Sequence, residues 1–373
     1  MKYFIVAGEP SGDLHASNLI KNINKIDTNS EIVGWGGELM QAENCKILKH
    51  YKELAFMGFI EVILNINKII HNFKIIKKQI INFNPDVIIF IDYPGFNLKL
   101  SKFCKQNNFK TVYYISPQVW AWHKSRVKTI KKYIDKMFVI LPFEKEFYSN
   151  YNYDVEYYGN PLIELINNKK NNFKGKDIFI KNNNLTKKEI IAILPGSRKQ
   201  EIENMLPQMQ KVVQYFPNYQ FVIAATSSIN NELYLENINN IQISIVYNQT
   251  YDLLLSSSAA IVTSGTATLE TALLKIPQIV CYKGLFISYI IAKKLIKLNF
   301  ISLVNIIMHK NVVKELIQNE MNHTNIKQEL SKILNDKQHR QNIIEDYDKL
   351  SLRLGNGETS FLVASKIFDL ISK

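Results

Sequence analysis

Short runs of β-branched and aromatic residues alternate along the chain with longer stretches in which apolar residues recur every three or four positions. The first pattern is typical of buried strands and the second of amphipathic helices, so their alternation predicts an α/β fold built on parallel sheets. Helical patterns such as 14–26, 202–215 and 266–274 separate the strands. The predicted strands are residues 3–7, 31–34, 87–91, 111–115, 137–141 and 155–158 in the first half, and 189–194, 221–225, 242–246, 259–263 and 278–281 in the second.

This repetition predicts two Rossmann-like domains, at residues 1–165 and 166–349, that face a central cleft. A polar tract rich in Asn and Lys, residues 167–188, is the predicted linker region. In this architecture the final helix, about residues 350–373 here, often packs back on the first domain. Ligands of such sheets bind at the carboxyl ends of the strands, so the loops there are the candidate sites.

The loop after the first strand, residues 8–13 (GEPSGD), opens a helix. It matches neither the dinucleotide-binding GxGxxG pattern nor a Walker A loop. Its glycines allow a ligand to approach closely, whereas Glu9 and Asp13 would repel a phosphate. A hydroxyl-rich ligand such as a sugar therefore suits this loop. The alternative is a tight turn in which Asp13 or Ser11 caps the helix.

The strand at 87–91 leads into residues 92–97 (DYPGFN). A carboxylate that leaves a buried strand at its carboxyl end is partly desolvated, which raises its pKa and suits Asp92 to accept a proton from a hydroxyl. The alternative is an Asx turn before the proline. The next strand is followed by residues 116–122 (SPQVWAW), whose Trp120 and Trp122 suit a sugar or acyl platform as well as they suit core packing.

Two turns of the second half suit a nucleotide. In LPGSR, helix-start N–H groups around Gly196 and Ser197 and the guanidinium of Arg198 would bind an anionic diphosphate. In a second turn at residues 264–266, Ser264, Gly265 and Thr266 would hold phosphate, and Glu270, one helical turn later, could accept ribose hydroxyls. The alternative for this turn is helix capping by Ser264 or Thr266.

Other motifs argue against competing chemistries. Asp346 and Asp348 spell the acid-x-acid pattern of metal-dependent sugar transferases, but they lie in a polar helical stretch and are interpreted as a solvated face, so no metal site is predicted. The seven histidines show no HxH or HExxH spacing, and no G-x-S-x-G nucleophile elbow of a serine hydrolase is present. Three widely spaced cysteines are typical of a reducing cytoplasm.

The net positive charge of the chain indicates an anionic partner. Lys and Arg number 46 against 33 Asp and Glu, a net charge of +13. Residues 62–136 hold 14 of these cations and only three acids, and residues 283–314 hold six lysines and no acid. Basicity without a recognised motif does not indicate nucleic acid. Since neither a signal peptide nor an apolar stretch of about 18 residues is present, the protein is expected to be soluble or peripheral.

Part of this charge lies on a predicted helix, residues 59–81. At about 100° per residue one stripe faces the core, namely Phe59, Val62, Ile63, Ile66, Ile70 and Phe73. Ile60, Leu64 and Ile75 fall outside it, beside basic residues. These surplus apolar residues indicate a face that lies on an anionic membrane or grips acyl chains, and the alternative is an unusually wide core face.

In their order along the chain these motifs resemble the lipid-A-disaccharide synthases. The matching stretches are AGEPSGD at 7–13, ELAFMG at 53–58, IDYPGFN at 91–97, SPQVWAW at 116–122, LPFEKEFY at 141–148, LPGSR at 194–198, SGTATLE at 264–270, and residues 300–305. The resemblance implies the two-domain GT-B glycosyltransferase fold and an inverting reaction that needs neither a metal nor another cofactor. The implied substrates are UDP-2,3-diacylglucosamine and 2,3-diacylglucosamine 1-phosphate, which give the β-1,6-linked disaccharide 1-phosphate and UDP.

The resemblance also implies roles for single residues. Asp92 matches the proposed catalytic base, and Glu9 is assigned to catalysis beside it. Arg198 and Asn305 match other polar active-site positions and are assigned to substrate binding. The turn and helix that bind UDP match Ser264, Gly265, Thr266 and Glu270, and the acyl- and membrane-contacting helix carries Ile60, Leu64 and Ile75. Some family members have an acidic residue where this chain has Gly95, so the base is assigned to Asp92 alone.

The resemblance also implies a cytoplasmic location, peripheral to the inner membrane. It further implies a homodimer with exchanged C-terminal segments, for which residues 355–357 (GNG) offer a hinge. Two other functions stay open. A UDP-sugar 2-epimerase can share the architecture but needs no acyl-binding surface. A non-catalytic membrane-binding scaffold would release no UDP.

Overall fold

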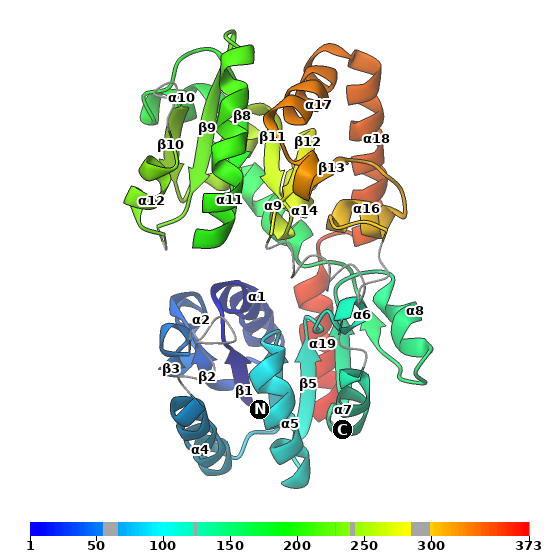
Figure 1. Ribbon diagram of the computed structural model, residues 1–373. Helices are drawn as coiled ribbons and strands as arrows, with labels where there is room; N and C mark the ends of the chain where they lie inside the picture. Colours follow the sequence, from blue (N-terminus) through cyan, green and yellow to red (C-terminus); the bar gives the residue numbers. More distant parts are fainter. Residues whose placement is uncertain (55–65, 123–124, 228, 239–242, 285–298, 373) are drawn as a thin grey trace. The chain divides into compact units, whose positions relative to one another are not determined.

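The computed structural model describes residues 1–54, 66–122, 125–227, 229–238, 243–284 and 299–372. The chain forms two compact units: unit 1 comprises Met1–Pro161 and Gly355–Lys373, and unit 2 comprises Leu162–Leu354. Each unit contains one parallel sheet with helices packed on it (Figure 1), which confirms the predicted α/β class.

The sheet of unit 1 has the strand order β3-β2-β1-β4-β5-β6-β7, and all its pairs are parallel. Its strands are β1 (Lys2–Ala7), β2 (Glu31–Gly36), β3 (Lys46–His50), β4 (Val87–Ile91), β5 (Lys110–Tyr114), β6 (Lys136–Val139) and β7 (Glu156–Tyr157). Its helices are α1 (Pro10–Ile26), α2 (Glu38–Ala42), α4 (Ile66–Phe83), α5 (Pro94–Gln106), α6 (Val119–Trp122), α7 (Arg126–Tyr133), α8 (Glu144–Ser149) and α19 (Thr359–Ile371), with a 3₁₀ turn at Tyr51–Glu53.

Alternation along the strands of unit 1 sends side chains into two cores, one on each face of the sheet. In β1, Phe4 points into one core and Ile5 into the other. Helices α4, α5 and α7 cover the first core, and α1 and α19 cover the second (Figure 1). Because residues on both faces are buried, β4 reads as the uninterrupted apolar run VIIFI.

The sheet of unit 2 has the order β10-β9-β8-β11-β12-β13 and is also parallel throughout. Its strands are β8 (Glu189–Leu194), β9 (Tyr219–Ala225), β10 (Ile243–Tyr247), β11 (Ser257–Thr263), β12 (Gln278–Tyr282) and β13 (Lys314–Ile317). Its helices are α9 (Leu162–Asn172), α10 (Lys176–Asn182), α11 (Lys199–Met209), α12 (Asn231–Glu236), α13 (Thr250–Leu255), α14 (Thr266–Leu273), α16 (Leu303–Met308), α17 (His323–Asn335) and α18 (Lys337–Leu354), with 3₁₀ turns at Gln210–Tyr215 and Gln318–Glu320.

Every predicted strand is present, with ends shifted by at most two residues. The prediction missed β3 and β13, which are edge strands with charged residues and little apolar patterning. The predicted linker was wrong, because residues 167–188 contain most of α9 and all of α10 and belong to unit 2. The chain passes from unit 2 back to unit 1 at Gly355, within the predicted hinge, where φ is +99°.

Helix α4 corrects the predicted orientation of the basic helix. Its buried face runs through Asn72, Ile76 and Ile80, roughly a quarter turn from the predicted stripe. Ile70, predicted to face the core, is 49% exposed, whereas Ile75, predicted to face outward, packs half-buried against the core. The predicted outward residues 60 and 64 lie outside the described residues.

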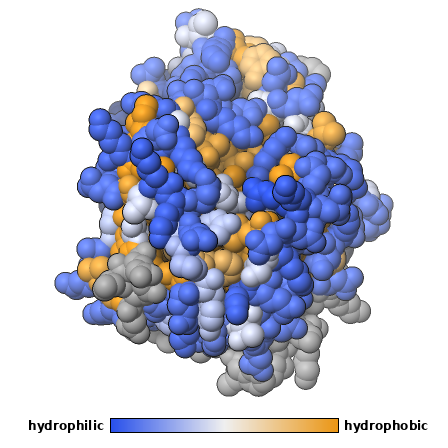
Figure 2. All heavy atoms as spheres, turned by 90° about the horizontal axis from the view of Figure 1, so that it is seen from above, coloured by the Kyte–Doolittle hydropathy of each residue, from blue (hydrophilic) through white to orange (hydrophobic). Residues whose placement is uncertain are grey.

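The surface is mostly polar on the face seen in Figure 2, where hydrophobic side chains lie in smaller areas among hydrophilic ones. Within the described ranges, every helix is too short or too polar to cross a membrane.

Candidate functional site

The strand order of each sheet reverses between two neighbouring strands. In unit 1 the reversal lies between β1 and β4, and in unit 2 it lies between β8 and β11. Ligands of parallel sheets bind beside the carboxyl ends of such strand pairs, because the loops diverge there. The loops that follow these four strands are the ones that contain Glu9, Asp92, Gly196 and Gly265. Topology therefore places each predicted loop at the edge of its own sheet where a ligand is expected.

The backbone at Asp92 is held in an unusual conformation. Asp92 and Tyr93 have φ angles of +43° and +50°, in the left-handed region that residues with a Cβ rarely adopt. The carbonyl oxygen of Asp92 accepts hydrogen bonds from the Asn97 amide, at 2.8 Å, and from the Tyr113 hydroxyl. The Tyr93 ring lies where a Cβ on Gly8 would be 2.3 Å from it, so only glycine fits there. Local strain at a functional site is typically held in this way by its surroundings.

The carboxyl group of Asp92 has the electrostatics expected of a base. Burial, together with the negative charge of Glu9, raises its pKa to about 6, and the Tyr93 N–H acts in the opposite direction. A carboxyl group with a pKa near 6 is ionised at neutral pH, yet it is more basic than an ordinary aspartate. The structure thus brings Glu9 and Asp92 together, as the sequence predicted, within one loop cluster of unit 1.

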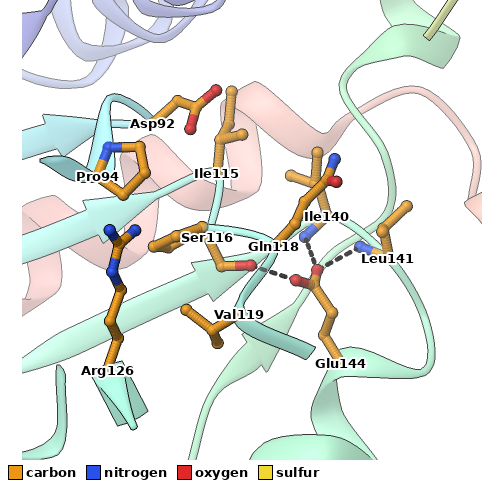
Figure 3. A pocket seen from close by; sticks show the side chains of 11 residues that line it. Asp92, Pro94, Ile115, Ser116, Gln118, Val119, Arg126, Ile140, Leu141 and Glu144 are labelled. Carbon is orange, nitrogen blue, oxygen red and sulfur yellow. Dashed lines mark hydrogen bonds between the residues drawn. The ribbon is translucent and has the colours of Figure 1, made fainter. Parts of the chain in front are cut away.

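Asp92 lines a cavity of about 230 Å³ inside unit 1 (Figure 3). A second carboxylate of this cavity, Glu144 at the start of α8, was not predicted. It accepts hydrogen bonds from the Ser116 hydroxyl and from the N–H groups of Ile140 and Leu141, at 3.2 and 2.9 Å. Burial raises the pKa of Glu144 to about 7, and these hydrogen bonds limit the rise. The motif LPFEKEFY, just after β6, was the available signal for this residue.

The structure also shows the surroundings of two other candidate residues of unit 1, Asp13 and Trp120. Asp13 neither faces a ligand nor caps its own helix, because its carboxylate is buried and accepts the N–H groups of Gly37, Leu39 and Met40 at the start of α2, at 2.7 to 3.1 Å. Trp120 is buried edge-to-face against Phe143, with ring centres 4.9 Å apart, which confirms the packing interpretation. The side chain of residue 122 is outside the described part.

A larger cavity, of about 400 Å³, lies within unit 2. All seven residues predicted for the nucleotide turns line it, namely Gly196, Ser197, Arg198, Ser264, Gly265, Thr266 and Glu270. The Arg198 side chain is 72% exposed, and its guanidinium pairs with the Glu201 carboxylate at 3.6 Å. The structure therefore joins two turns that are far apart in the sequence into one candidate anion site.

The two turns nevertheless differ in their free hydrogen-bond donors. At the first turn, the Glu201 carboxylate accepts the N–H groups of Ser197 and Arg198, at 2.9 and 3.2 Å. Gly196 has φ +113°, and a Cβ there would lie 2.5 Å from the Glu201 carboxylate. These two N–H groups, predicted to bind phosphate, are thus occupied by the protein's own carboxylate. The sequence analysis did not assign Glu201, although acid three residues into a helix is a common cap.

At the second turn the donors are available. Among the described residues, the N–H groups of Thr266 and Ala267 have no hydrogen-bond partner. Capping by Ser264 or Thr266 was a wrong alternative, since neither side chain caps α14 and the Ser264 hydroxyl donates to the carbonyl of Ile301 at 3.1 Å. Thr266 and Ala267 line the cavity, and the space beside Gly265 is open, since a Cβ there would meet nothing within 4 Å.

Glu270 is oriented by a residue that the sequence analysis missed. The Tyr251 hydroxyl donates to one oxygen of the Glu270 carboxylate at 3.0 Å. Burial raises the pKa of Glu270, and the Tyr251 hydroxyl lowers it. One oxygen is fixed in this way while the other can accept a ligand hydroxyl, as predicted for ribose.

Asn305 lies apart from the cavity lining. Its side chain is fully buried, and its oxygen accepts the N–H groups of Val312 and Val313 at 2.8 and 3.0 Å. Its nitrogen donates to the Val313 carbonyl and the Glu315 carboxylate, both at 2.9 Å. Because both ends of the amide are occupied, the structure favours a positioning role over the predicted direct contact with substrate.

The acid-x-acid pattern near the C-terminus is also structural, although not as predicted. Asp346 is buried rather than solvated and pairs with Lys310 at 2.6 Å, and Asp348 pairs with Lys275 at 2.6 Å. Within the described ranges, no three His, Cys, Asp or Glu side chains are grouped as metal ligands.

The sequence is similar to a known family over almost its whole length. A model of the lipid-A-disaccharide synthetase family matches residues 3–364. The chain is 35% identical over 375 residues to a lipid-A-disaccharide synthase of Coxiella burnetii, covering 98% of each chain. It is 32% identical over 379 residues to one of Geobacter sulfurreducens, covering 100% of this chain and 98% of the other.

Solved structures with the same fold are more distant in sequence. A UDP-GlcNAc 2-epimerase from Neisseria meningitidis, bound to UDP-GlcNAc, superposes with a TM-score of 0.72 at 13% identity, covering 99% of this chain and 100% of that one. A calicheamicin glycosyltransferase superposes with a TM-score of 0.61 at 10% identity, covering 100% and 99%. At these identities the likeness shows the fold alone, and it agrees with the predicted GT-B architecture.

Proposed function

Because the chain belongs to the lipid-A-disaccharide synthase family of glycosyltransferases, we propose that it transfers 2,3-diacylglucosamine from its UDP derivative to the 6-hydroxyl of 2,3-diacylglucosamine 1-phosphate. The products are the β-1,6-linked disaccharide 1-phosphate and UDP. The observation that carries the chemistry is Asp92, a carboxylate with a raised pKa at the switch point of the unit 1 sheet.

The proposed step is a direct displacement with inversion. Asp92 takes the proton of the acceptor 6-hydroxyl as that oxygen attacks the anomeric carbon of the donor. The new bond forms between the acceptor oxygen and the anomeric carbon, while the bond from that carbon to the diphosphate oxygen breaks and its electron pair leaves with UDP. General base catalysis of this kind contributes roughly 10²- to 10⁴-fold.

The leaving UDP is bound by the cavity of unit 2 in this proposal. The free N–H groups of Thr266 and Ala267 and the exposed guanidinium of Arg198 suit the developing negative charge of the diphosphate. Glu270 accepts ribose hydroxyls. Since these groups are amides and a cation, the reaction is proposed to need no metal, and turnover is expected to persist in excess EDTA.

The protein is also proposed to work on the cytoplasmic face of the inner membrane, where acylated substrates reside. One exposed stripe of α4 contains Ile70, Lys74, Lys78 and Ile81, and its two isoleucines are 49% and 47% exposed. Apolar side chains flanking lysines suit an anionic lipid surface. Replacing both isoleucines by serine should reduce pelleting with anionic vesicles, whereas Leu352→Ser, at a 79% exposed site of unit 2, should not.

A homodimer with exchanged C-terminal segments is the proposed assembly. The chain returns to unit 1 through Gly355 and Gly357, both with positive φ, so this short crossing can adopt a second path. Light scattering should then give twice the mass of the 43.3 kDa chain.

The test of the function is an assay for UDP release with the acylated donor and acceptor, in which each is omitted in turn. We expect release only when both are present, with one disaccharide formed per UDP. Conversion of UDP-N-acetylglucosamine alone would instead favour a 2-epimerase, the activity named for the Neisseria relative of this fold. A non-catalytic scaffold would release no UDP under any of these conditions.

A further inference from the structure

The cavity beside Asp92 contains a guanidinium that the proposed reaction does not yet use. Arg126 is the first residue of α7 and lines the cavity together with Asp92, Pro94 and Ser116. Figure 3 shows its side chain extending from α7 toward Pro94, on the side of the cavity where β4 ends. Arg126 is one of only four arginines in a chain with 46 cationic residues.

Among the residues that the structure describes, Arg126 has no counter-charge of its own. Within the described ranges it forms no ion pair and no hydrogen bond, although two carboxylates line the same cavity. Glu144 is instead held by the Ser116 hydroxyl and two backbone N–H groups. Burying part of a guanidinium without an anion beside it costs free energy, and a negatively charged ligand would offset that cost.

Arg126 also lies close to the groups that hold Asp92. Burial raises the pKa of the Tyr113 phenol far above 10, and the positive charge of Arg126 acts in the opposite direction. The same phenol donates its hydroxyl to the backbone carbonyl of Asp92. A ligand that reaches Asp92 from this cavity therefore passes within the field of the guanidinium.

We propose that Arg126 binds the 1-phosphate of the acceptor sugar and thereby sets which hydroxyl of that sugar faces Asp92. A guanidinium binds phosphate through two parallel N–H···O bonds, which fixes orientation as well as position. The acceptor carries its phosphate on C1 and its reacting hydroxyl on C6, and the cavity offers a cation for the first and a carboxylate for the second. This inference rests on the proposed function and assigns Arg126 to substrate binding.

The test compares two acceptors on three proteins. Transfer is measured with 2,3-diacylglucosamine 1-phosphate and with the same sugar lacking phosphate, for the wild type, Arg126→Gln and Lys128→Gln. Lys128 is an exposed cation of the same helix and is the matched control. Arg126→Gln should lower kcat/KM for the phosphorylated acceptor by about 10- to 100-fold, mainly through KM, and should leave the dephosphorylated acceptor within about twofold of the wild type.

Two other results would contradict the assignment of Arg126 to the acceptor phosphate. Equal losses on both acceptors would show a structural role, and a weaker UDP affinity in Arg126→Gln would show that the guanidinium serves the donor diphosphate. Arg126→Lys, which keeps the charge but not the two-pronged geometry, should recover part of the activity. If Arg126→Gln does not fold, the lysine variant alone must still show a loss confined to the phosphorylated acceptor. A wild type that transfers to neither acceptor would instead refute the proposed function.

Discussion

In unit 1 the loops after β1 and β4 place two carboxylates, Glu9 and Asp92, where the strand order reverses. In unit 2 the loops after β8 and β11 place N–H groups, hydroxyls and a guanidinium at the corresponding point. Both sheets are parallel, so the two units differ in their loops. In unit 1 the burial of Asp92 and the negative charge of Glu9 raise the pKa of Asp92. In unit 2 the groups at the same edge favour an anion.

The backbone conformations of the loops at these two sheet edges also differ. Asp92 and Tyr93 adopt left-handed conformations with full side chains, and hydrogen bonds to the Asp92 carbonyl hold them. The turns of unit 2 instead contain Gly196 and Gly265, so that a ligand can approach their backbone without a side chain in the way. One architecture thus presents carboxylates in one unit and amides with a guanidinium in the other, according to the residues of its loops.

The largest expected effect comes from removing the charge of Asp92. Asp92→Asn should lower kcat by roughly 10²- to 10⁴-fold because the acceptor hydroxyl loses its base. UDP affinity, measured by calorimetry, should change little, since the UDP site is proposed in unit 2. Asp86→Asn, at the opposite end of β4, is the control and should keep near-normal turnover. Normal turnover of Asp92→Asn would remove this carboxylate from the mechanism.

The buried carboxyl of Glu144 should govern how stability depends on pH. Its pKa in the folded protein, about 7, lies above its ordinary value of 4.5, so the folded state holds the proton more tightly than the unfolded state does. Stability is therefore lost as pH rises from 4.5 through 7, by up to about 3 kcal/mol. Urea unfolding at pH 5 and pH 8 should show this loss in the wild type.

Replacing Glu144 by Gln should remove that part of the pH dependence, because an amide can keep the hydrogen bonds without ionising. Glu146→Gln, an exposed site of the same helix, should leave it in place. An unchanged pH dependence in Glu144→Gln would assign the loss of stability to other groups.

The two glycine turns of unit 2 should respond differently to alanine. Gly196→Ala should lower the free energy of unfolding by about 1–3 kcal/mol, since φ is +113° and the new Cβ would clash with Glu201. Gly265→Ala should fold normally, because its backbone is extended and nothing lies near the new Cβ, but it should weaken UDP binding about tenfold by filling the cavity. Equal stability losses in both variants would contradict the difference between the turns.

A smaller effect is expected from Glu201, whose carboxylate occupies the first turn. Glu201→Gln keeps an oxygen for the N–H groups of Ser197 and Arg198 but removes a negative charge that pairs with the Arg198 guanidinium beside the proposed diphosphate site. UDP should therefore bind about two- to fivefold more tightly. Glu203→Gln, on the same helix and outside the cavity lining, should not change the affinity. Weaker binding would show that the carboxylate helps to form the site.

The smallest effect concerns the pair of carboxylates in unit 1. The negative charge of Glu9 raises the pKa of Asp92, so Glu9→Gln should lower that pKa and shift the acid limb of the kcat/KM profile to lower pH by a fraction of a unit. Profiles between pH 4.5 and 8 measure this shift, and Glu31→Gln at the other end of the sheet serves as the control. A shift to higher pH would contradict the repulsion between the two groups.

Much of the fold was predictable because its strands are continuous apolar runs. The bounds of β4 and β8 follow directly from their sequences, and the loops after them contain the residues that line the cavities. Glu144, Glu201 and Tyr251 were not predicted. Each acts through a bond to another residue, and a polar residue in a helix looks the same in the sequence whether it faces water or a neighbouring turn.

The sequence by itself determined the order of strands and helices, the family, and the loops that carry polar side chains, because these depend on local patterns and on motifs. Only the tertiary structure decided that Asp13 and Asn305 bind backbone groups, that Glu201 occupies one anion turn and leaves the other open, and that α4 turns Ile70 outward. The physical reason is that burial and hydrogen-bond partners are set by contacts that the local sequence pattern does not encode.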